Sequence, residues 1–115
     1  MSTPGGRATA PTDDCPVEVA LASISGRWTT LLLRNLSVGR LTFSELAGSL
    51  PELSDKVLTD RLAALVARGL VSREVTRGFP NRSSYALTAR GQELVPLLGA
   101  LYRAGRAIQD LGEGG

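Results

Sequence analysis

Apolar and polar residues follow two different periods along this chain, and the change of period predicts the order of its helices and strands. A helical period begins at Cys15, where Pro16 suits the first turn of a short helix that we expect to end near residue 23. Gly26 separates it from a second expected helix over residues 27–36. The inward positions of this second helix are predicted to be Trp28, Leu31, Leu32 and Leu36.

Two further helices are predicted on either side of Pro51. Thr42 caps or precedes a short helix over residues 43–50, and Ser54 is a favourable N-cap for a longer helix that Gly69 ends. The apolar residues that we expect to be buried in these two helices are Phe43, Leu46, Leu50, Leu58, Leu62 and Leu65.

A period of two over residues 70–77 and 83–88 predicts a β-hairpin with one buried face. The inward positions are expected to be Val71, Val75, Tyr85 and Leu87. Thr88 then caps a final helix, in which Pro96 is expected to bend the axis. The apolar stripe of this helix consists of Leu94, Leu97, Leu98, Leu101 and Ile108.

The expected fold class is mainly α with a small β-hairpin. We predict one domain over residues 15–111, between a disordered tail over residues 1–14 and a frayed tail over residues 112–115. Two helices joined by Pro51, Glu52 and Leu53, and followed directly by a hairpin, have the layout of a winged helix-turn-helix.

The chain has 115 residues, no histidine and a single cysteine, Cys15. These counts allow no internal disulfide and leave too few ligands for a structural zinc site. Histidine is the usual general base for a nucleophile, so we expect neither an enzyme nor a cofactor. No apolar run reaches the roughly 20 residues that span a bilayer, and the first residues lack the order of a secretory signal. We therefore expect a cytoplasmic protein with no membrane partner.

Positive charge is concentrated in the predicted hairpin, although the net charge of the whole chain is only +2. Residues 70–90 contain four arginines and one glutamate, whereas the charges cancel over residues 40–69. Charge alone favours a solvated loop. The position of this charge, directly after the helix-turn-helix, favours double-stranded DNA as the partner.

The predicted helix after Ser54 turns a polar side outward when its leucines are buried, and an α-helix fits the major groove of B-form DNA. Arg77 and Arg82 flank the hairpin tip, as contact with phosphates or the minor groove requires. Helical spacing places Asp55, Lys56, Thr59, Asp60 and Ala63 outward, with Val57 and Arg61 on the flanks. Among these, the residues that we expect to contact DNA are Asp55, Lys56, Thr59 and Arg61. An alternative keeps the fold without DNA, as a protein interaction module for an acidic partner.

Several short motifs resemble the HxlR family of bacterial regulators, which is related to the MarR-type winged helix. The resemblance covers roughly residues 15–110 and departs from the family pattern in the hairpin turn after Pro80. The motifs include Cys15-Pro16, Gly26-Arg27-Trp28, Phe43 with Glu45-Leu46, Leu53-Ser54, Lys56, Gly69, Tyr85 with Leu87-Thr88, and Gly91.

This resemblance implies a sequence-specific transcriptional regulator, which we expect to be a repressor that binds a pseudopalindromic operator as a homodimer. The implied DNA-contact positions are Ser44, Ser54, Lys56, Thr59 and Arg61, with Arg77, Asn81, Arg82 and Ser83 in the wing. The first and last helices are implied to pack between subunits, although the stripe of the last helix has an alternative role in closing the monomer core. The expected dimerisation residues are Val17, Leu21, Leu94, Leu98, Leu101 and Ile108.

Cys15 has two interpretations. Some HxlR relatives sense quinones, aldehydes or oxidants through a cysteine at this position, so the resemblance implies a sensor of oxidants or small electrophiles. The N-terminus of a helix stabilises a thiolate, whereas the carboxylates of Asp13, Asp14 and Glu18 oppose it. The alternative is a structural cysteine. In a further alternative, a small-molecule effector binds in a pocket at the dimer interface.

Overall fold

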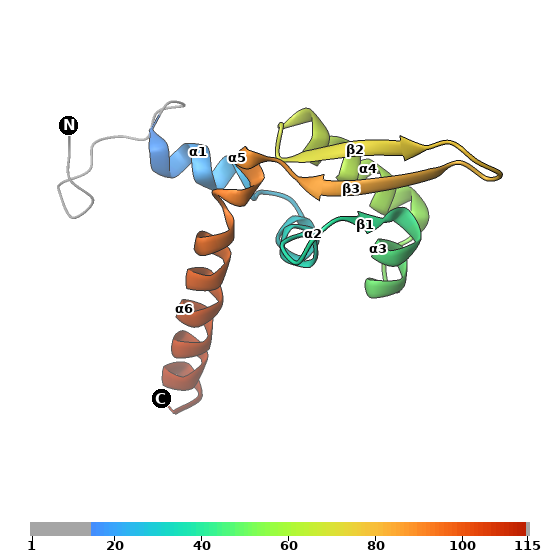
Figure 1. Ribbon diagram of the computed structural model, residues 1–115. Coiled ribbons are helices and arrows are strands. Elements are labelled where there is room, and N and C mark those ends of the chain that lie inside the picture. The colour runs from blue at the N-terminus through green and yellow to red at the C-terminus, as the bar shows by residue number, and fades with distance from the viewer. Residues whose placement is uncertain (1–14, 115) are drawn as a thin grey trace.

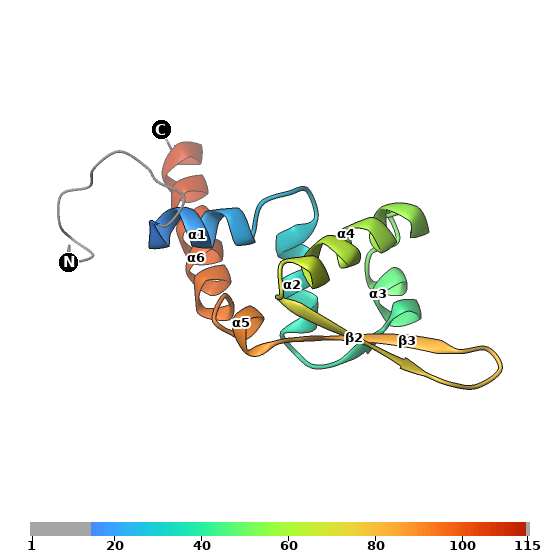
Figure 2. The same ribbon diagram turned by 90° about the horizontal axis from the view of Figure 1, so that it is seen from above.

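The computed structural model describes residues 15–114, so the predicted tail over residues 1–14 and the last residue lie outside the described part of the chain. Within these described residues, six helices and three strands follow one another in the predicted order, with one added strand and one divided helix (Figures 1 and 2). They are α1 (Pro16–Ser23), α2 (Thr29–Leu36), β1 (Leu41–Thr42), α3 (Phe43–Ser49), α4 (Asp55–Ala67), β2 (Val71–Thr76), β3 (Arg82–Leu87), α5 (Ala89–Gln92) and α6 (Val95–Gly114). None of the described helices is both long and apolar enough to cross a bilayer.

The sheet has three antiparallel strands in the order β1-β3-β2. The hairpin was predicted, but β1 was not, because its two residues are too short to show a period of two. β1 pairs only with Ser84 and Tyr85 of β3, so the outer part of the hairpin has no third strand beside it. The predicted burial of Val75 is wrong, because the outer part of the hairpin extends beyond the core, and its side chain is 45% exposed.

Side-chain caps fix where α3 and α4 begin. The Thr42 hydroxyl accepts a hydrogen bond from the Glu45 N–H at 3.1 Å, and the Glu45 carboxylate accepts one from the Thr42 N–H at 2.8 Å. Together these bonds form a capping box. Gly69 ends α4 with φ of +76°, a conformation that favours glycine, and its N–H donates to the Val66 carbonyl.

The core lies between α2, α3, α4 and the inner part of the sheet. Leu32, Leu36, Leu46 and the three predicted leucines of α4 are all buried, as expected. Leu33 is also fully buried, although it was not predicted, because α2 is enclosed on a wider face than one stripe. The complete buried set is Leu32, Leu33, Leu36, Leu46, Leu53, Leu58, Leu62, Leu65, Leu70, Val71, Tyr85, Leu94 and Leu98.

The predicted last helix is divided in two. Thr88 caps the short α5, as predicted, and its hydroxyl accepts a hydrogen bond from the Gly91 N–H at 3.1 Å. Because α6 begins at Val95, Pro96 lies in its first turn, where a missing N–H costs little. The predicted bend at Pro96 is therefore wrong. The helix then extends to Gly114, past the end expected near residue 111.

Two of the expected dimerisation residues belong to the monomer core. Leu94 and Leu98 are buried within the single chain, so this part of the apolar stripe closes the monomer core, which was the alternative role of the last helix. The rest of α6 extends away from the body of the molecule (Figures 1 and 2). Its exposed apolar side chains are Leu101, Tyr102, Ile108 and Leu111, and those of α1 are Val17, Val19 and Leu21.

Candidate nucleic-acid interface

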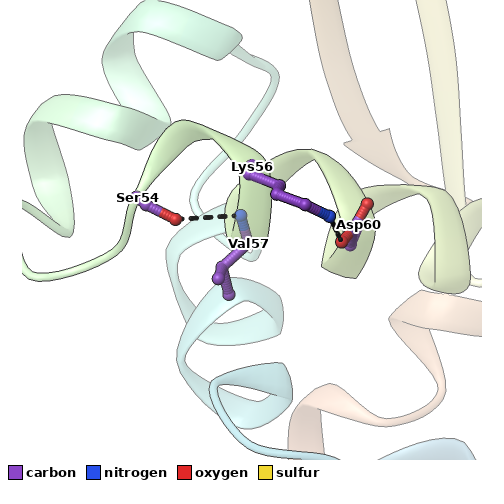
Figure 3. A network of polar contacts seen from close by, with 4 residues as sticks. All are labelled: Ser54, Lys56, Val57 and Asp60. Carbon is purple, nitrogen blue, oxygen red and sulfur yellow. Dashed lines mark hydrogen bonds and ion pairs between the residues drawn. The ribbon is translucent and has the colours of Figure 1, made fainter.

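The N-terminal turn of α4 presents polar side chains to solvent on the side opposite its buried leucines. Ser54 is the N-cap, and its hydroxyl accepts a hydrogen bond from the Val57 N–H at 3.2 Å (Figure 3). The hydroxyl proton of Ser54 remains available as a donor. Asp55, Lys56 and Thr59 are also exposed. The structure therefore brings four of the predicted contact residues together.

Lys56 is the only lysine in the chain, and it lies along the outer side of α4. Its ammonium group is 3.2 Å from a carboxylate oxygen of Asp60, one turn further along the helix (Figure 3). The two side chains are 84% and 65% exposed. An exposed pair at this spacing contributes only about 0.3–0.5 kcal/mol, so a phosphate or a base can replace Asp60 as the partner of Lys56 at little cost.

Thr59 lies where α4 faces the sheet. It lines a hollow of about 360 Å³ together with Ala63 and Val66 of α4 and with Arg73 and Tyr85 of the hairpin. Arg61 lies elsewhere, since it is half-buried and its guanidinium is beside Gly26 in the loop before α2. The structure thus separates Arg61 from the cluster of Lys56 and Thr59.

We call β2, β3 and the turn between them the wing. One depression of about 590 Å³ brings together Ser44 of α3 and the outer residues of the wing, including the predicted contacts Asn81, Arg82 and Ser83. Its lining consists of Thr42, Phe43, Ser44, Pro80, Asn81, Arg82 and Ser83. Arg77 lies outside this depression, on the other side of the turn.

Two arginines of this surface were missing from the predicted contact residues. Arg40 donates a hydrogen bond to the Ser84 hydroxyl at 3.1 Å, and Arg73 donates one to the Ser83 hydroxyl at 3.0 Å. Both guanidiniums lie over the wing, although Arg40 precedes it by many residues. Arg73 shares the face of Val71 and Val75, which the period of two assigned to the core, and Arg40 depends on the unpredicted pairing of β1 with β3, so the sequence pattern selects neither arginine.

Positive charge on this surface is largely unneutralised. Within residues 15–114, the Lys56–Asp60 contact is the only ion pair. Arg73, Arg77 and Arg82 are exposed on the wing, where Glu74 is the one carboxylate among residues 71–87. Such a surface favours a polyanion whose phosphates follow the wing and the N-terminus of α4.

Cys15 lies far along the chain from this surface, at the N-cap of α1. It is half-buried and its side chain makes no capping hydrogen bond, while its carbonyl accepts from the Val19 N–H at 2.9 Å. The first helix therefore begins where the sequence predicted, with Pro16 in its first turn.

Comparison with known proteins agrees with this geometry. The family model described as HxlR-like helix-turn-helix matches residues 23–111. An uncharacterized HTH-type transcriptional regulator of Methanothermobacter thermautotrophicus is 40% identical over 92 residues, covering 80% of this chain and 70% of the relative.

Two solved structures show the same fold. The redox regulator HypR in its reduced form has a TM-score of 0.79 at 32% identity, covering 88% of this chain and 100% of HypR. The reduced form of the transcriptional regulator YodB from B. subtilis has a TM-score of 0.66 at 30% identity, covering 84% of this chain and 93% of YodB. This is a family of transcriptional regulators and not of enzymes. The chain therefore belongs to the HxlR-like helix-turn-helix family of DNA-binding transcriptional regulators.

Proposed function

We propose that this regulator is a homodimeric repressor that places α4 of each subunit in the major groove of one half of a pseudopalindromic operator. The observation that carries the proposal is the exposed polar N-terminal turn of α4 beside an arginine-rich wing. A groove about 12 Å wide admits a helix, and its neighbouring phosphates and minor groove are then within reach of the wing. The bound dimer would repress by blocking the access of other proteins to the operator.

Each predicted contact residue has a role in this arrangement. Lys56 binds a phosphate or the acceptor atoms of a guanine, and Thr59 contacts a thymine methyl group or a phosphate. Ser54 donates its hydroxyl proton to a phosphate. Asp55 repels phosphates unless it accepts from a cytosine amino group, so it contributes to base discrimination. Arg61 lies beside Gly26 and apart from this cluster, so the one contact left to it is with the backbone at the edge of the groove. On the wing side, the phosphate-contacting residues are Ser44, Arg77, Asn81, Arg82 and Ser83.

The proposed dimer is supported by the apolar side chains that α1 and α6 leave exposed. Ile108 is 68% exposed and Leu101 is 44% exposed, and Val17 and Leu21 are exposed on α1. Several such side chains on two helices of a small domain favour burial against a second copy of the same surface. The two recognition helices must then lie about 34 Å apart to enter successive major grooves.

Selection of bound sequences from random duplexes tests operator binding. We expect a pseudopalindromic consensus and an affinity that falls steeply with salt, because bound cationic side chains release counterions. Lys56→Gln should weaken binding and Lys56→Arg should largely keep it. A binder without sequence preference, or a protein that retards no duplex at low salt, would contradict the proposal and favour a protein interaction module.

The single lysine allows a second, independent test of the same surface. Apart from the terminal amine, Lys56 is the only group that acetylating N-hydroxysuccinimide esters modify readily. We expect the operator duplex to slow acetylation of Lys56 strongly and that of the terminal amine little. Equal rates with and without the operator would place DNA on another surface.

We further propose that Cys15 regulates the dimer. Cys15 is half-buried and is the N-cap of α1, one of the proposed dimerisation helices, and the related HypR is a redox regulator. With one cysteine per chain, two thiols can lose two protons and two electrons to an oxidant such as diamide, forming one disulfide between subunits. A mixed disulfide and alkylation are the other routes.

Diamide should release the operator from the wild type and not from Cys15→Ser. Non-reducing electrophoresis and intact mass distinguish the intersubunit disulfide from the other adducts. Release that persists in Cys15→Ser would exclude the thiol route and favour an effector that binds non-covalently.

A further inference from the structure

The tip of the wing carries an aromatic side chain that contributes nothing to the core. Phe79 is fully exposed in the turn between β2 and β3, and Val75 behind it is also exposed. With Pro80 they line a concave surface at the end of the hairpin. Apolar side chains gathered at a projecting tip mark a contact site, because their exposure to water is unfavourable until a ligand covers them.

The turn holds Phe79 in place. The last strand pair is Thr76 with Arg82, and beyond it the Gly78 N–H donates to the side-chain oxygen of Asn81 at 2.9 Å. This bond closes the turn around Phe79. A side chain presented on a closed turn loses less conformational entropy on binding than one on an open loop.

The charges around Phe79 fit a nucleic acid as the ligand. Arg77 and Arg82 are exposed on either side of the tip, and within the described residues neither is in an ion pair. Two guanidiniums beside one apolar group match a groove in which phosphates line both walls and apolar base surfaces lie at the bottom. A protein partner would instead need carboxylates on both sides of an apolar pocket.

The tip also projects far enough to reach the base pairs. It extends past α3 and α4 in both views (Figures 1 and 2). The pairing of β1 with β3 ends at Ser84. At about 3.3 Å per residue, the hairpin extends roughly 10 Å from Ser84 to the turn. This is more than the depth of the minor groove of B-form DNA, which is roughly 7.5 Å.

We propose that Phe79 inserts into the minor groove and partly unstacks one base step when α4 occupies the neighbouring major groove. The inference rests on the proposed operator binding and adds a residue that sets sequence preference without a hydrogen bond to a base. Flexible pyrimidine–purine steps unstack most easily, so the operator should carry TA or CA under each wing. Binding should also bend the duplex.

Fluorescence of 2-aminopurine tests this insertion directly, since the base brightens when it loses its stacking partner. The probe is a duplex of the selected operator, with 2-aminopurine placed in turn at each position under the wing. We expect one step to brighten with the wild type and with Phe79→Leu, and not with Phe79→Ala. Val38→Ala, which removes an exposed apolar side chain outside the wing, should behave as the wild type.

Affinity provides the second measurement. Phe79→Ala should bind the operator about tenfold more weakly, as expected for loss of one base–aromatic contact. Replacing the flexible step by GC should weaken the wild type but leave Phe79→Ala nearly unchanged, because the two changes remove the same interaction.

The outcomes separate this inference from operator binding itself. Normal operator affinity in Phe79→Ala, or no brightening at any position with the wild type bound, would overturn the insertion and leave the regulator proposal intact. A wild type that selects no operator at all would overturn both. Brightening that persists in Phe79→Ala would assign the unstacking to another residue and would also overturn the inference.

Discussion

Asp60 pairs with the one lysine of the chain, which we propose contacts the operator. Its carboxylate lies 3.2 Å from the Lys56 ammonium on the exposed side of α4, where the proposed operator phosphates also lie. We predict that Asp60→Asn tightens operator binding by about threefold to tenfold, because it frees Lys56 and removes a charge that repels phosphate. Fluorescence anisotropy with a labelled operator measures the change.

Asp110→Asn is the matched control, since it removes an exposed carboxylate from α6, outside the proposed DNA surface. It should change operator affinity little. Weaker binding by Asp60→Asn would show instead that this carboxylate accepts a hydrogen bond from the operator.

Gly91 is fixed by the approach of another segment. A Cβ at this position would overlap the Leu70 carbonyl oxygen, and backbone atoms cannot move aside as a flexible side chain can. We predict that Gly91→Ala lowers the free energy of unfolding by about 1–3 kcal/mol. Urea denaturation followed by circular dichroism measures it.

The control for this prediction is Gly48→Ala in α3, where a Cβ would meet nothing within 4 Å. Alanine is the better helix former, so this variant should be as stable as the wild type or more stable by up to about 1 kcal/mol. Equal effects of the two substitutions would mean that the contact with Leu70 is not what requires glycine.

At the scale of the elements, the wing should supply affinity that depends on salt more than on sequence. Arg77 and Arg82 are exposed cations at its tip. We predict that the double variant Arg77→Gln, Arg82→Gln lowers the slope of log affinity against log salt by about 1.8, if each arginine contacts one phosphate. Titrations at several salt concentrations give the slope.

A second double variant, Arg103→Gln, Arg106→Gln, removes the same charge from α6 and should leave the slope unchanged. A common decrease in both variants would attribute the salt dependence to net charge rather than to contacts of the wing.

Most elements could be predicted because their signals are local. Ser54, Gly69 and three leucines at helical spacing define α4, and all five behave in the structure as the sequence indicated. β1 could not be predicted, because its two residues become a strand only by pairing with β3. The same pairing brings Arg40 to the wing, so the contact surface was predicted only in part.

Tertiary packing determines which part of a predicted apolar face is buried. Period alone assigns Val75 and Val71 to the same face, but only Val71 lies over the core. The same stripe on the last helix includes Leu94 and Leu98, which the monomer buries, and Leu101 and Ile108, which it leaves exposed. Spacing identifies an apolar face, whereas the body of the protein determines how much of that face it covers.

At the scale of the whole molecule, the exposed part of α6 should control assembly without supporting the fold of the monomer. Replacing Leu101 and Ile108 together by aspartate puts two charges where the proposed partner subunit packs. Because Ile108 is 68% and Leu101 44% exposed in the monomer, we predict that the variant keeps its helical content. It should nevertheless sediment as a monomer.

The monomeric variant should bind a single operator half-site about as weakly as the wild type does, and lose the additional affinity that the full operator gives the dimer. Effective concentration supplies that affinity, since the second recognition helix is already held near its half-site when the first one binds. Val38→Asp adds a charge at an exposed apolar position outside α1 and α6, and should remain dimeric with full operator affinity. Sedimentation velocity and operator titrations decide between these results. A dimeric Leu101→Asp, Ile108→Asp variant would exclude this face of α6 from the interface, and a wild type that is monomeric at all concentrations would refute the symmetric arrangement on the operator.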